Sequence, residues 1–336
     1  MDRSAIHFDL VGVGSPIMDL VAPVPESFLI HLDGSKGGMT LVDEGEMSRI
    51  LSLLGSEPIQ ATGGSAANTI FNASRLGLRT AFIGKLGDDK TAEVYRRYYR
   101  AAGVNADRFK RGAAPTGRCL ALVTPDAQRT MRVCLGAAAS LSPEEISVDD
   151  FRDCRHAHIE GYLAFNPALC AKVLDSARAA GCGISLDLSS FEVVTGARDW
   201  LFNQIGRGID IVLANEDEIR ALLPNSGTDF AALARELAAL GTLAAVKVGK
   251  DGAWLARGGE LHRVPPVVVS DVLDTIGAGD AWAAGFLAAY LRGRPLPECG
   301  ALASLLGAET VRHPGPLIPE SAWTRILKQA RSISPA

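Results

Sequence analysis

The sequence of 336 residues lacks the features that mark several classes of protein. Its longest apolar runs, such as Ala281 to Leu291, fall well short of the roughly 20 residues that span a bilayer. The first ten residues contain no basic segment followed by an apolar stretch, so we expect no secretory signal and no membrane segment. A formal net charge of −4 gives no reason to expect binding to nucleic acid. These absences predict a cytoplasmic protein.

The chain also has no C-x-x-C pair, no low-complexity tract and no repeat of solenoid length. Because 47% of the residues are hydrophobic, a large core can form without disulfides, and we interpret the six scattered cysteines as buried reduced thiols. Nothing resembling a linker separates two cores. We therefore expect one domain over residues 1–336.

Helical and short apolar β segments alternate along most of the chain, which predicts an α/β fold with a mainly parallel central sheet and helices on both faces. The expected helices are 66–76 (ended by Gly77), 91–102, 167–180, 216–223 and 230–240, and the expected strands are 80–83, 157–160, 183–188, 210–213 and 243–248. Two stretches break this rhythm, at about 15–62 and 112–135, and the second reads as a β-hairpin. We interpret both together as a small β lid over the sheet.

Polar residues follow several of the predicted parallel strands. Glu160, Asp187, Asn215 and Gly249 each stand at or just after a strand end. Because ligands bind at the carboxyl ends of the strands in open α/β sheets, these residues are expected to share one rim.

Two familiar glycine patterns are absent. Gly12 and Gly14 are followed by Pro16 and Ile17, which does not fit the dinucleotide fingerprint G-x-G-x-x-G. The phosphate-binding pattern G-x-x-x-x-G-K-[ST] is missing too. Any phosphate chemistry therefore needs another cradle.

That cradle is predicted at Asp274–Asp280, which reads D-T-I-G-A-G-D and leads into an apolar helical run. The two glycines and the alanine allow backbone N–H groups to face an anion, and the helix dipole adds to the attraction. Asp280 at the helix start is an ordinary choice for an N-cap. An anion hole beside a carboxylate also suits phosphoryl transfer, in which the carboxylate accepts the proton of an attacking hydroxyl.

A second glycine segment, Gly63–Asn68, precedes a predicted helix. Paired glycines permit close approach to a small ligand, and Asn68 is placed to bind hydroxyls. A flexible loop with Ser65 as the helix cap explains the same residues equally well.

Together the two segments resemble the signatures of the ribokinase or PfkB family of carbohydrate and nucleoside kinases. The resemblance implies a ribokinase-like fold, with Asp280 as general base and with the anion hole formed by Gly277, Ala278 and Gly279. On the acceptor side it implies contacts from Asp19, Gly63, Gly64 and Asn68.

The resemblance also implies a nucleotide side with ATP and Mg²⁺. Asn215 and Glu218 resemble an N-x-x-E element that acts on Mg²⁺ through water, although a solvated acidic helix start explains them as well. Lys247, Gly249 and Gly252 resemble the strand and turn along the nucleotide. K⁺ is implied beside the anion hole with Asp274 as a ligand, but two prolines in the loop at 312–316 depart from the family pattern. His313 is interpreted as a loop residue.

Segments 19–22, 36–44 and 160–163 resemble the adenosine-kinase-like branch, so we expect an ATP-dependent kinase for the primary hydroxyl of a ribonucleoside or sugar. Met39 and Glu160 are added to the acceptor side, and Leu41 and Phe165 are candidates for an apolar slot with Met39. A sugar kinase for ribose, fructose or a related sugar is the first alternative, and a non-catalytic sensor on the same fold is the second. The edge strands of the lid could pair in a homodimer, and the same edges could equally be covered within one chain, so the sequence leaves the oligomeric state open.

Overall fold

The computed structural model describes residues 7–126, 128–224 and 226–333. Its centre is a nine-stranded sheet in the order β16-β15-β14-β13-β12-β11-β1-β5-β7. All neighbouring strands from β7 to β14 are parallel, and β15 and β16 are antiparallel additions at one edge. The strands are β1 (Leu10–Val13), β5 (Thr80–Ile83), β7 (Val104–Asn105), β11 (His156–Glu160), β12 (Gly183–Asp187), β13 (Ile211–Ala214), β14 (Leu243–Lys247), β15 (Ala253–Arg257) and β16 (Glu260–Val264).

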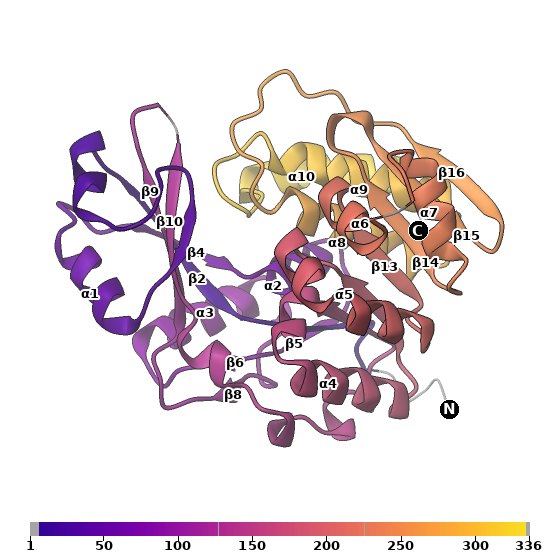
Figure 1. Cartoon of the computed structure of the whole chain (residues 1–336), viewed down its shortest axis with the longest axis horizontal. Helices are drawn as coiled ribbons and strands as arrows, with labels where there is room; N and C mark the ends of the chain where they lie inside the picture. Colours follow the sequence, from indigo (N-terminus) through magenta and orange to yellow (C-terminus); the bar gives the residue numbers. More distant parts are fainter. Residues whose placement is uncertain (1–6, 127, 225, 334–336) are drawn as a thin grey trace.

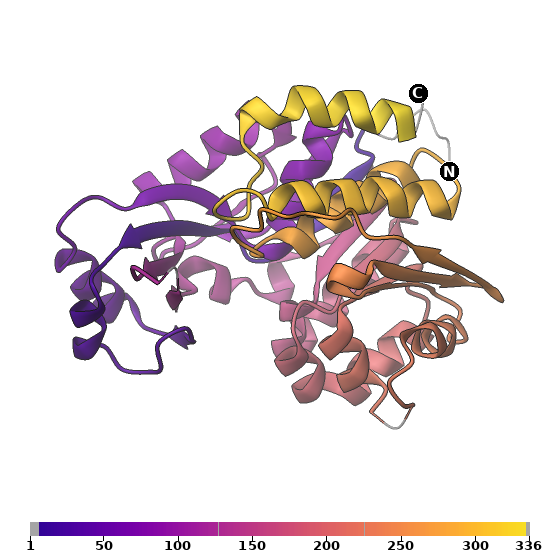
Figure 2. The same ribbon diagram turned by 90° about the horizontal axis from the view of Figure 1, so that it is seen from above.

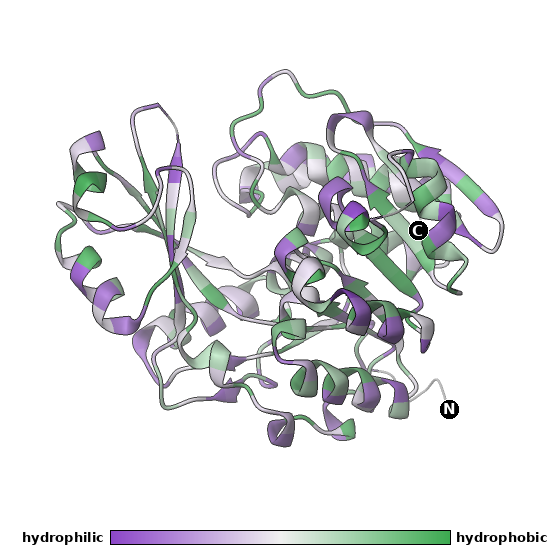
Figure 3. Ribbon diagram, in the orientation of Figure 1, coloured by the Kyte–Doolittle hydropathy of each residue, from purple (hydrophilic) through white to green (hydrophobic). Residues whose placement is uncertain are grey.

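Helices cover both faces of this sheet, so its inner strands are short apolar runs buried on both sides (Figures 1 and 3). One core contains side chains of α2 (Ser65–Arg75), α3 (Lys90–Ala101), α8 (Ala278–Tyr290), α9 (Leu296–Thr310) and α10 (Glu320–Ile333). The opposite core contains side chains of α4 (Pro167–Ala179), α5 (Phe191–Gly206), α6 (Glu216–Leu222) and α7 (Phe230–Ala238). The predicted α/β class with a mainly parallel sheet is confirmed.

Local sequence explains where the helices begin and end. The side chains of Asp89, Asn166 and Ser190 accept hydrogen bonds from the first turns of α3, α4 and α5. Gly77 has a φ of 88° directly after α2, as expected for a glycine that ends a helix. No helix within the described ranges has the length and apolar character that a membrane crossing requires.

A second, five-stranded sheet in the order β3-β10-β9-β2-β4 projects from the larger one (Figures 1 and 2). Its strands are β2 (Ile17–Pro23), β3 (Met39–Leu41), β4 (Ile59–Gly63), β9 (Gly117–Val123) and β10 (Arg129–Cys134), with α1 (Glu44–Ser52) beside them. The other short elements are β6 (Lys85–Leu86), β8 (Lys110–Arg111) and the 3-10 helices η2 (Glu26–His31), η3 (Gly136–Ser140), η4 (Pro143–Glu145), η5 (Val148–Asp150), η6 (Gly161–Phe165) and η7 (Gly249–Asp251).

The two faces of the five-stranded sheet differ in character. One face is buried, and its side chains join those of α1 in the core: Met18, Leu20, Leu120, Leu122, Met47 and Ile50. The strand register places Asp19, Met39, Leu41 and Arg129 together on the opposite face. We call this second surface the open face. The edges β3 and β4 carry exposed Met39 and Ile59, and a dimer through them stays a prediction.

Several elements lie outside the predicted set. The hairpin β15–β16 turns at Gly258 and Gly259, whose φ values of 54° and 92° are typical of a two-residue turn, and this glycine pair was the signal that could have revealed it. Helix α9 is buried along much of its length, so its sequence has no clear polar face. The six cysteines are free thiols, and five of them are buried.

Candidate active site

The segment Asp274–Asp280 forms the entry to α8. The helix begins at Ala278, three residues before the predicted run, and its N-cap is Gly277 with a φ of 73°. A Cβ on Gly277 would lie within 2.6 Å of Pro316, so only glycine fits there. The first N–H groups of a helix have no acceptor within the helix, and residues 277–280 are only partly buried. The first turn of α8 can therefore present backbone N–H groups to an anion.

Asp280 is the third residue of α8 and not its N-cap, which corrects the capping interpretation. Its side chain points to α2 instead. Ser65 Oγ donates to Asp280 Oδ1 at 2.8 Å, and Asn68 Nδ2 donates to Oδ2 at 2.9 Å. Gly64 occupies the N-cap position of α2, so Ser65 is not that helix's cap either. The two glycine signatures meet at this carboxylate.

The hydrogen-bond donors to the Asp280 carboxylate are neutral groups, and burial is the main influence on its pKa. Desolvation by the surrounding protein raises the pKa of Asp280 to about 6, while the bonds from Asn68 and Ser65 work in the opposite direction. Such a carboxylate is ionised at neutral pH but binds a proton far more readily than an exposed aspartate. These are the properties of a general base.

The glycines before α2 make room for Asp19. A Cβ on Gly63 would lie 2.3 Å from Asp19 Oδ2, and a Cβ on Gly64, whose φ is 99°, would lie 2.2 Å from the carbonyl oxygen of Ser15. Burial, and then the nearby charge of Asp280, raises the pKa of Asp19 to about 7. A carboxylate of β2 and a carboxylate of α8 thus lie close enough to interact electrostatically.

Glu160 does not lie where a substrate contact would. It is 1% exposed at the end of β11, and its carboxylate accepts from Ser15 N at 2.8 Å and from Ala66 N at 3.1 Å. Burial raises the pKa of Glu160 to about 7. Since it fixes the first turn of α2 from beneath, its expected role as an acceptor contact is corrected to that of a positioning residue.

Asn215 and Glu218 form a closed capping box at the start of α6. The Asn215 side chain accepts from the N–H groups of Asp217 and Glu218, while Glu218 Oε2 and Oε1 accept from Asn215 N and Nδ2, both at 2.8 Å. Glu218 is 2% exposed, so it is not part of a solvated helix start. Burial and the charge of Asp187 raise the pKa of Glu218 to about 7.

Lys247 at the end of β14 forms an ion pair with Asp187, with Nζ 3.0 Å from Oδ2. Although burial alone would lower it, the pKa of Lys247 is raised by the carboxylates of Asp187 and Glu218. A Cβ on Gly279 would lie 3.4 Å from Lys247 Nζ, so this cation lies beside the anion hole. Gly249 and Gly252 follow with φ values of 46° and 95°. The predicted rim of strand-end residues is present.

The carboxylate of Asp274 contacts nitrogen atoms. Arg129 Nη2 lies 2.7 Å from its Oδ2, Gly315 N donates to the same oxygen at 2.6 Å, and Ile276 N donates to Oδ1 at 3.1 Å. The structure therefore shows an arginine and two backbone N–H groups on the carboxylate for which a K⁺ contact was expected.

Met39 and Leu41 are 57% and 63% exposed on the open face of the five-stranded sheet, which also carries Asp19. They are available as an apolar wall above the acceptor space. Phe165 is 65% exposed at the end of η6, and its membership of the same slot stays a prediction.

Three residues at the site had no assigned role in the sequence analysis. Ser65 was explained as a cap, Asp187 was only one of several strand-end residues, and Arg129 was part of the predicted hairpin. The end of β12 was a usable signal for Asp187. The other two contacts join segments more than 140 residues apart, and no local pattern indicates them.

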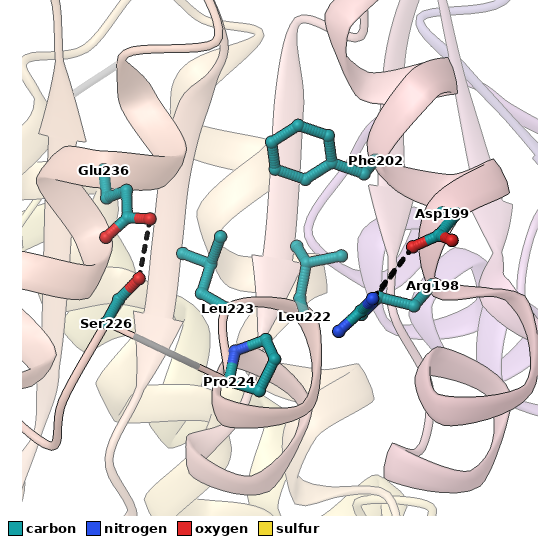
Figure 4. A pocket seen from close by; sticks show the side chains of 8 residues that line it. All are labelled: Arg198, Asp199, Phe202, Leu222, Leu223, Pro224, Ser226 and Glu236. Atoms are coloured by element: carbon teal, nitrogen blue, oxygen red, sulfur yellow. Dashed lines mark hydrogen bonds and ion pairs between the residues drawn. The ribbon is translucent and has the colours of Figure 1, made fainter.

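A separate hollow lies among the helices over the other face of the sheet, lined by residues of α5, α6 and α7 (Figure 4). Its polar side chains pair with one another: Arg198 with Asp199, and Ser226 with Glu236 at 2.7 Å. We assign it no chemistry, because the carboxylates and glycine turns described above lie elsewhere.

Comparisons with known proteins identify the family of this chain. Residues 42–323 match the model of the pfkB family carbohydrate kinases. A protein of Halopiger xanaduensis named an ATP-dependent ribose-1-phosphate kinase is 30% identical, over 76% of this chain and 82% of its own.

Two solved structures are also similar over nearly the whole chain. An adenosine kinase from Sinorhizobium meliloti is 34% identical with a TM-score of 0.84, covering 96% of this chain and 99% of its own. A probable sugar kinase from Rhizobium etli is 32% identical with a TM-score of 0.85, covering 97% and 99%.

The fold and the matched family define a phosphotransferase with an alcohol group as acceptor. The chain belongs to the pfkB family of carbohydrate kinases. Its homologues include both sugar kinases and adenosine kinases.

Proposed function

We propose that the protein transfers the γ-phosphate of ATP to the primary hydroxyl of a ribonucleoside or a related sugar, with Asp280 as the general base. The observation that carries this proposal is the position of Asp280. Its carboxylate, with a pKa near 6, lies in the first turn of a helix whose N–H groups can face the same opening. A base and an anion hole are thereby combined in the four consecutive residues 277–280.

On the acceptor side, Asp280 removes the proton from the attacking hydroxyl while the backbone of Gly277, Ala278 and Gly279 stabilises charge on the transferred group. Asp19 and the backbone at Gly63 and Gly64 bind the acceptor's other hydroxyls. Asn68 acts mainly through its bond to Asp280, since that bond already uses its amide. No covalent enzyme intermediate is needed.

On the nucleotide side, Lys247, Gly249 and Gly252 lie along the phosphates, and Asn215 positions Glu218. The carboxylates of Asp187, Glu218 and Asp280 interact electrostatically with one another and with the cation Lys247. Three negative groups thus stand against one positive group in this set, and a divalent cation fits the excess negative charge. Within the described ranges no group of three side chains forms a direct metal cage, which suits Mg²⁺ held through water at Glu218 and by phosphates. When bound, Mg²⁺ neutralises charge on the phosphates.

An adenosine-like acceptor is favoured by the open face of the five-stranded sheet. Met39 and Leu41 offer apolar area on the same face as Asp19, with β10 and β9 between β3 and β2, which suits a flat base attached to a hydroxyl-bearing ribose. A sugar without a base leaves that area exposed. Ribose, fructose or a related sugar is the alternative acceptor class, supported by the sugar kinases among the relatives.

The test is an ADP-release assay with adenosine, other nucleosides, ribose, fructose and related sugars, each with Mg²⁺ and ATP. We expect one acceptor class to stand out, and Met39→Ser to raise KM for a nucleoside more than for a free sugar. Thermal stabilisation by a ligand without ADP release from any acceptor would show a sensor in place of a kinase.

The free thiols are typical of a reducing compartment, and we propose a cytoplasmic location.

A further inference from the structure

The ion pair between Arg129 and Asp274 joins two parts of the molecule that are distant in sequence. Arg129 begins β10 of the five-stranded sheet, and Asp274 begins the segment that leads to the anion hole. The two side chains are 18% and 7% exposed, so the pair is largely shielded from water. Arg129 also lies near enough to Asp19 to lower that group's pKa, although burial dominates it. One guanidinium thus serves two carboxylates of the site.

The surroundings of Asp274 do not fit a monovalent metal cation. Such a cation binds carboxylate and carbonyl oxygens, whereas the neighbours of this carboxylate are donors: Arg129 Nη2, Gly315 N and Ile276 N. The carbonyl oxygen of Val311 is also engaged, since it accepts from Leu273 N at 2.8 Å and from Asp274 N at 3.3 Å. A cation placed here would meet N–H groups and a positive charge.

The loop that supplies Gly315 is held in place by a buried carboxylate. Glu309, 1% exposed near the end of α9, pairs with Arg312, His313 and Arg325 at 3.4, 3.0 and 2.6 Å. Pro316 then packs against Gly277. A rearrangement that turned carbonyl oxygens of residues 312–316 toward Asp274 would have to disturb these contacts.

We propose that the guanidinium of Arg129 supplies the positive charge beside the anion hole, so that this enzyme requires no K⁺ or other monovalent metal cation. Arg129 acts on the loop through Asp274 and is therefore a positioning residue. Its planar fork and permanent charge suit a shielded carboxylate better than a mobile ion does. The proposal rests on the proposed function only for its activity readout.

The first test compares the wild-type protein in potassium, sodium and tetramethylammonium chloride at equal ionic strength. We expect the melting temperature to agree within about 1 °C, and kcat/KM for the preferred acceptor to agree within about twofold. A rise in melting temperature that is specific to K⁺ and saturates with its concentration would overturn the proposal. Because the melting temperature does not depend on turnover, this comparison of salts tests the proposal even if no acceptor in the panel is phosphorylated.

The second test removes the charge. Arg129→Ala is expected to lower kcat/KM at least tenfold in tetramethylammonium chloride, and added guanidinium or K⁺ is expected to restore part of the loss. Arg129→Lys should retain more activity than the alanine variant. Wild-type kcat/KM in Arg129→Ala without these cations contradicts the proposal.

Arg118→Gln is the matched control, because Arg118 lies on the neighbouring strand β9 and pairs with Glu44 at the start of α1, away from Asp274. Neither guanidinium nor K⁺ should alter its kcat/KM. Equal rescue of Arg118→Gln and Arg129→Ala would show a general effect on the sheet and would also overturn the proposal.

Discussion

Asp280 on the acceptor side and Asp187 on the nucleotide side have hydrogen-bond partners of opposite kinds. Asp280 on the acceptor side is held by a hydroxyl and an amide, both neutral. Asp187 on the nucleotide side is held by the ammonium group of Lys247. Neutral donors leave a carboxylate with a raised proton affinity, whereas a buried cation favours the charged form.

This difference matches the proposed work of each side. A general base must take up a proton during the reaction, so its pKa should lie near the working pH. On the nucleotide side, the ion pair with Asp187 fixes the position of the Lys247 ammonium group. The same fold provides both environments within one row of strand ends and helix starts.

Removal of the base is the change with the largest expected effect. Asp280→Asn keeps the shape of the side chain, but its single amide oxygen can replace only one of the two accepting oxygens and it cannot take up a proton. The value of kcat should therefore fall about 10²-fold or more. Steady-state kinetics with the acceptor identified by the assay measure this, with circular dichroism to confirm the fold. Unchanged kcat would remove Asp280 from the mechanism.

Loss of the cation on the nucleotide side should act on stability. Lys247→Met leaves Asp187, which is 4% exposed, without its partner, and an uncompensated buried charge costs about 3 kcal/mol of unfolding free energy. Denaturant unfolding at pH 8 measures this loss. Lys250→Met, in the exposed turn that follows, is the control and should unfold like the wild type.

Denaturant unfolding of Asp280→Asn at pH 8 should show a gain in unfolding free energy, whereas Lys247→Met should show a loss. The pKa of Asp280 is about 6 in the folded protein against 3.8 ordinarily, so the folded state binds the proton more tightly. Its contribution to stability is present below pH 4 and lost as the pH rises through 6. At pH 8 the asparagine variant should therefore be more stable than the wild type by roughly 1 to 3 kcal/mol, and this difference should shrink toward pH 4. Equal stability at both pH values would mean that the carboxylate is not destabilised by burial.

The parallel βα part of the molecule could be predicted from sequence because its signals are local. Strand 80–83 matches β5 exactly in its bounds, and helix 66–76 matches α2 to within one residue at each end. Each of these elements is a compact apolar or amphipathic run between glycine or polar residues.

The chemistry within the site could be predicted only in part. The glycine segments indicated where an anion and a carboxylate meet, because backbone conformation depends on glycine locally. The burial of Glu160, the bonds of Ser65 and Asn68 to Asp280, and the arginine on Asp274 all depend on contacts across the fold. The spacing of residues along the sequence does not indicate these contacts.

The most direct test of the central claim is the pH dependence of kcat/KM in the wild type and in Asn68→Ala. The base must be ionised to act, so kcat/KM should rise with pH and level off between about pH 6 and 7, where Asp280 and Asp19 titrate. The hydrogen bond from Asn68 lowers the pKa of Asp280. Its loss in Asn68→Ala should therefore raise that pKa and move the rise in kcat/KM to higher pH by some tenths of a unit. Asn72→Ala, one helical turn away and without a hydrogen-bond partner for its amide among the described residues, should not move it. A flat profile from pH 5 to 8, or equal shifts in both variants, would contradict the account.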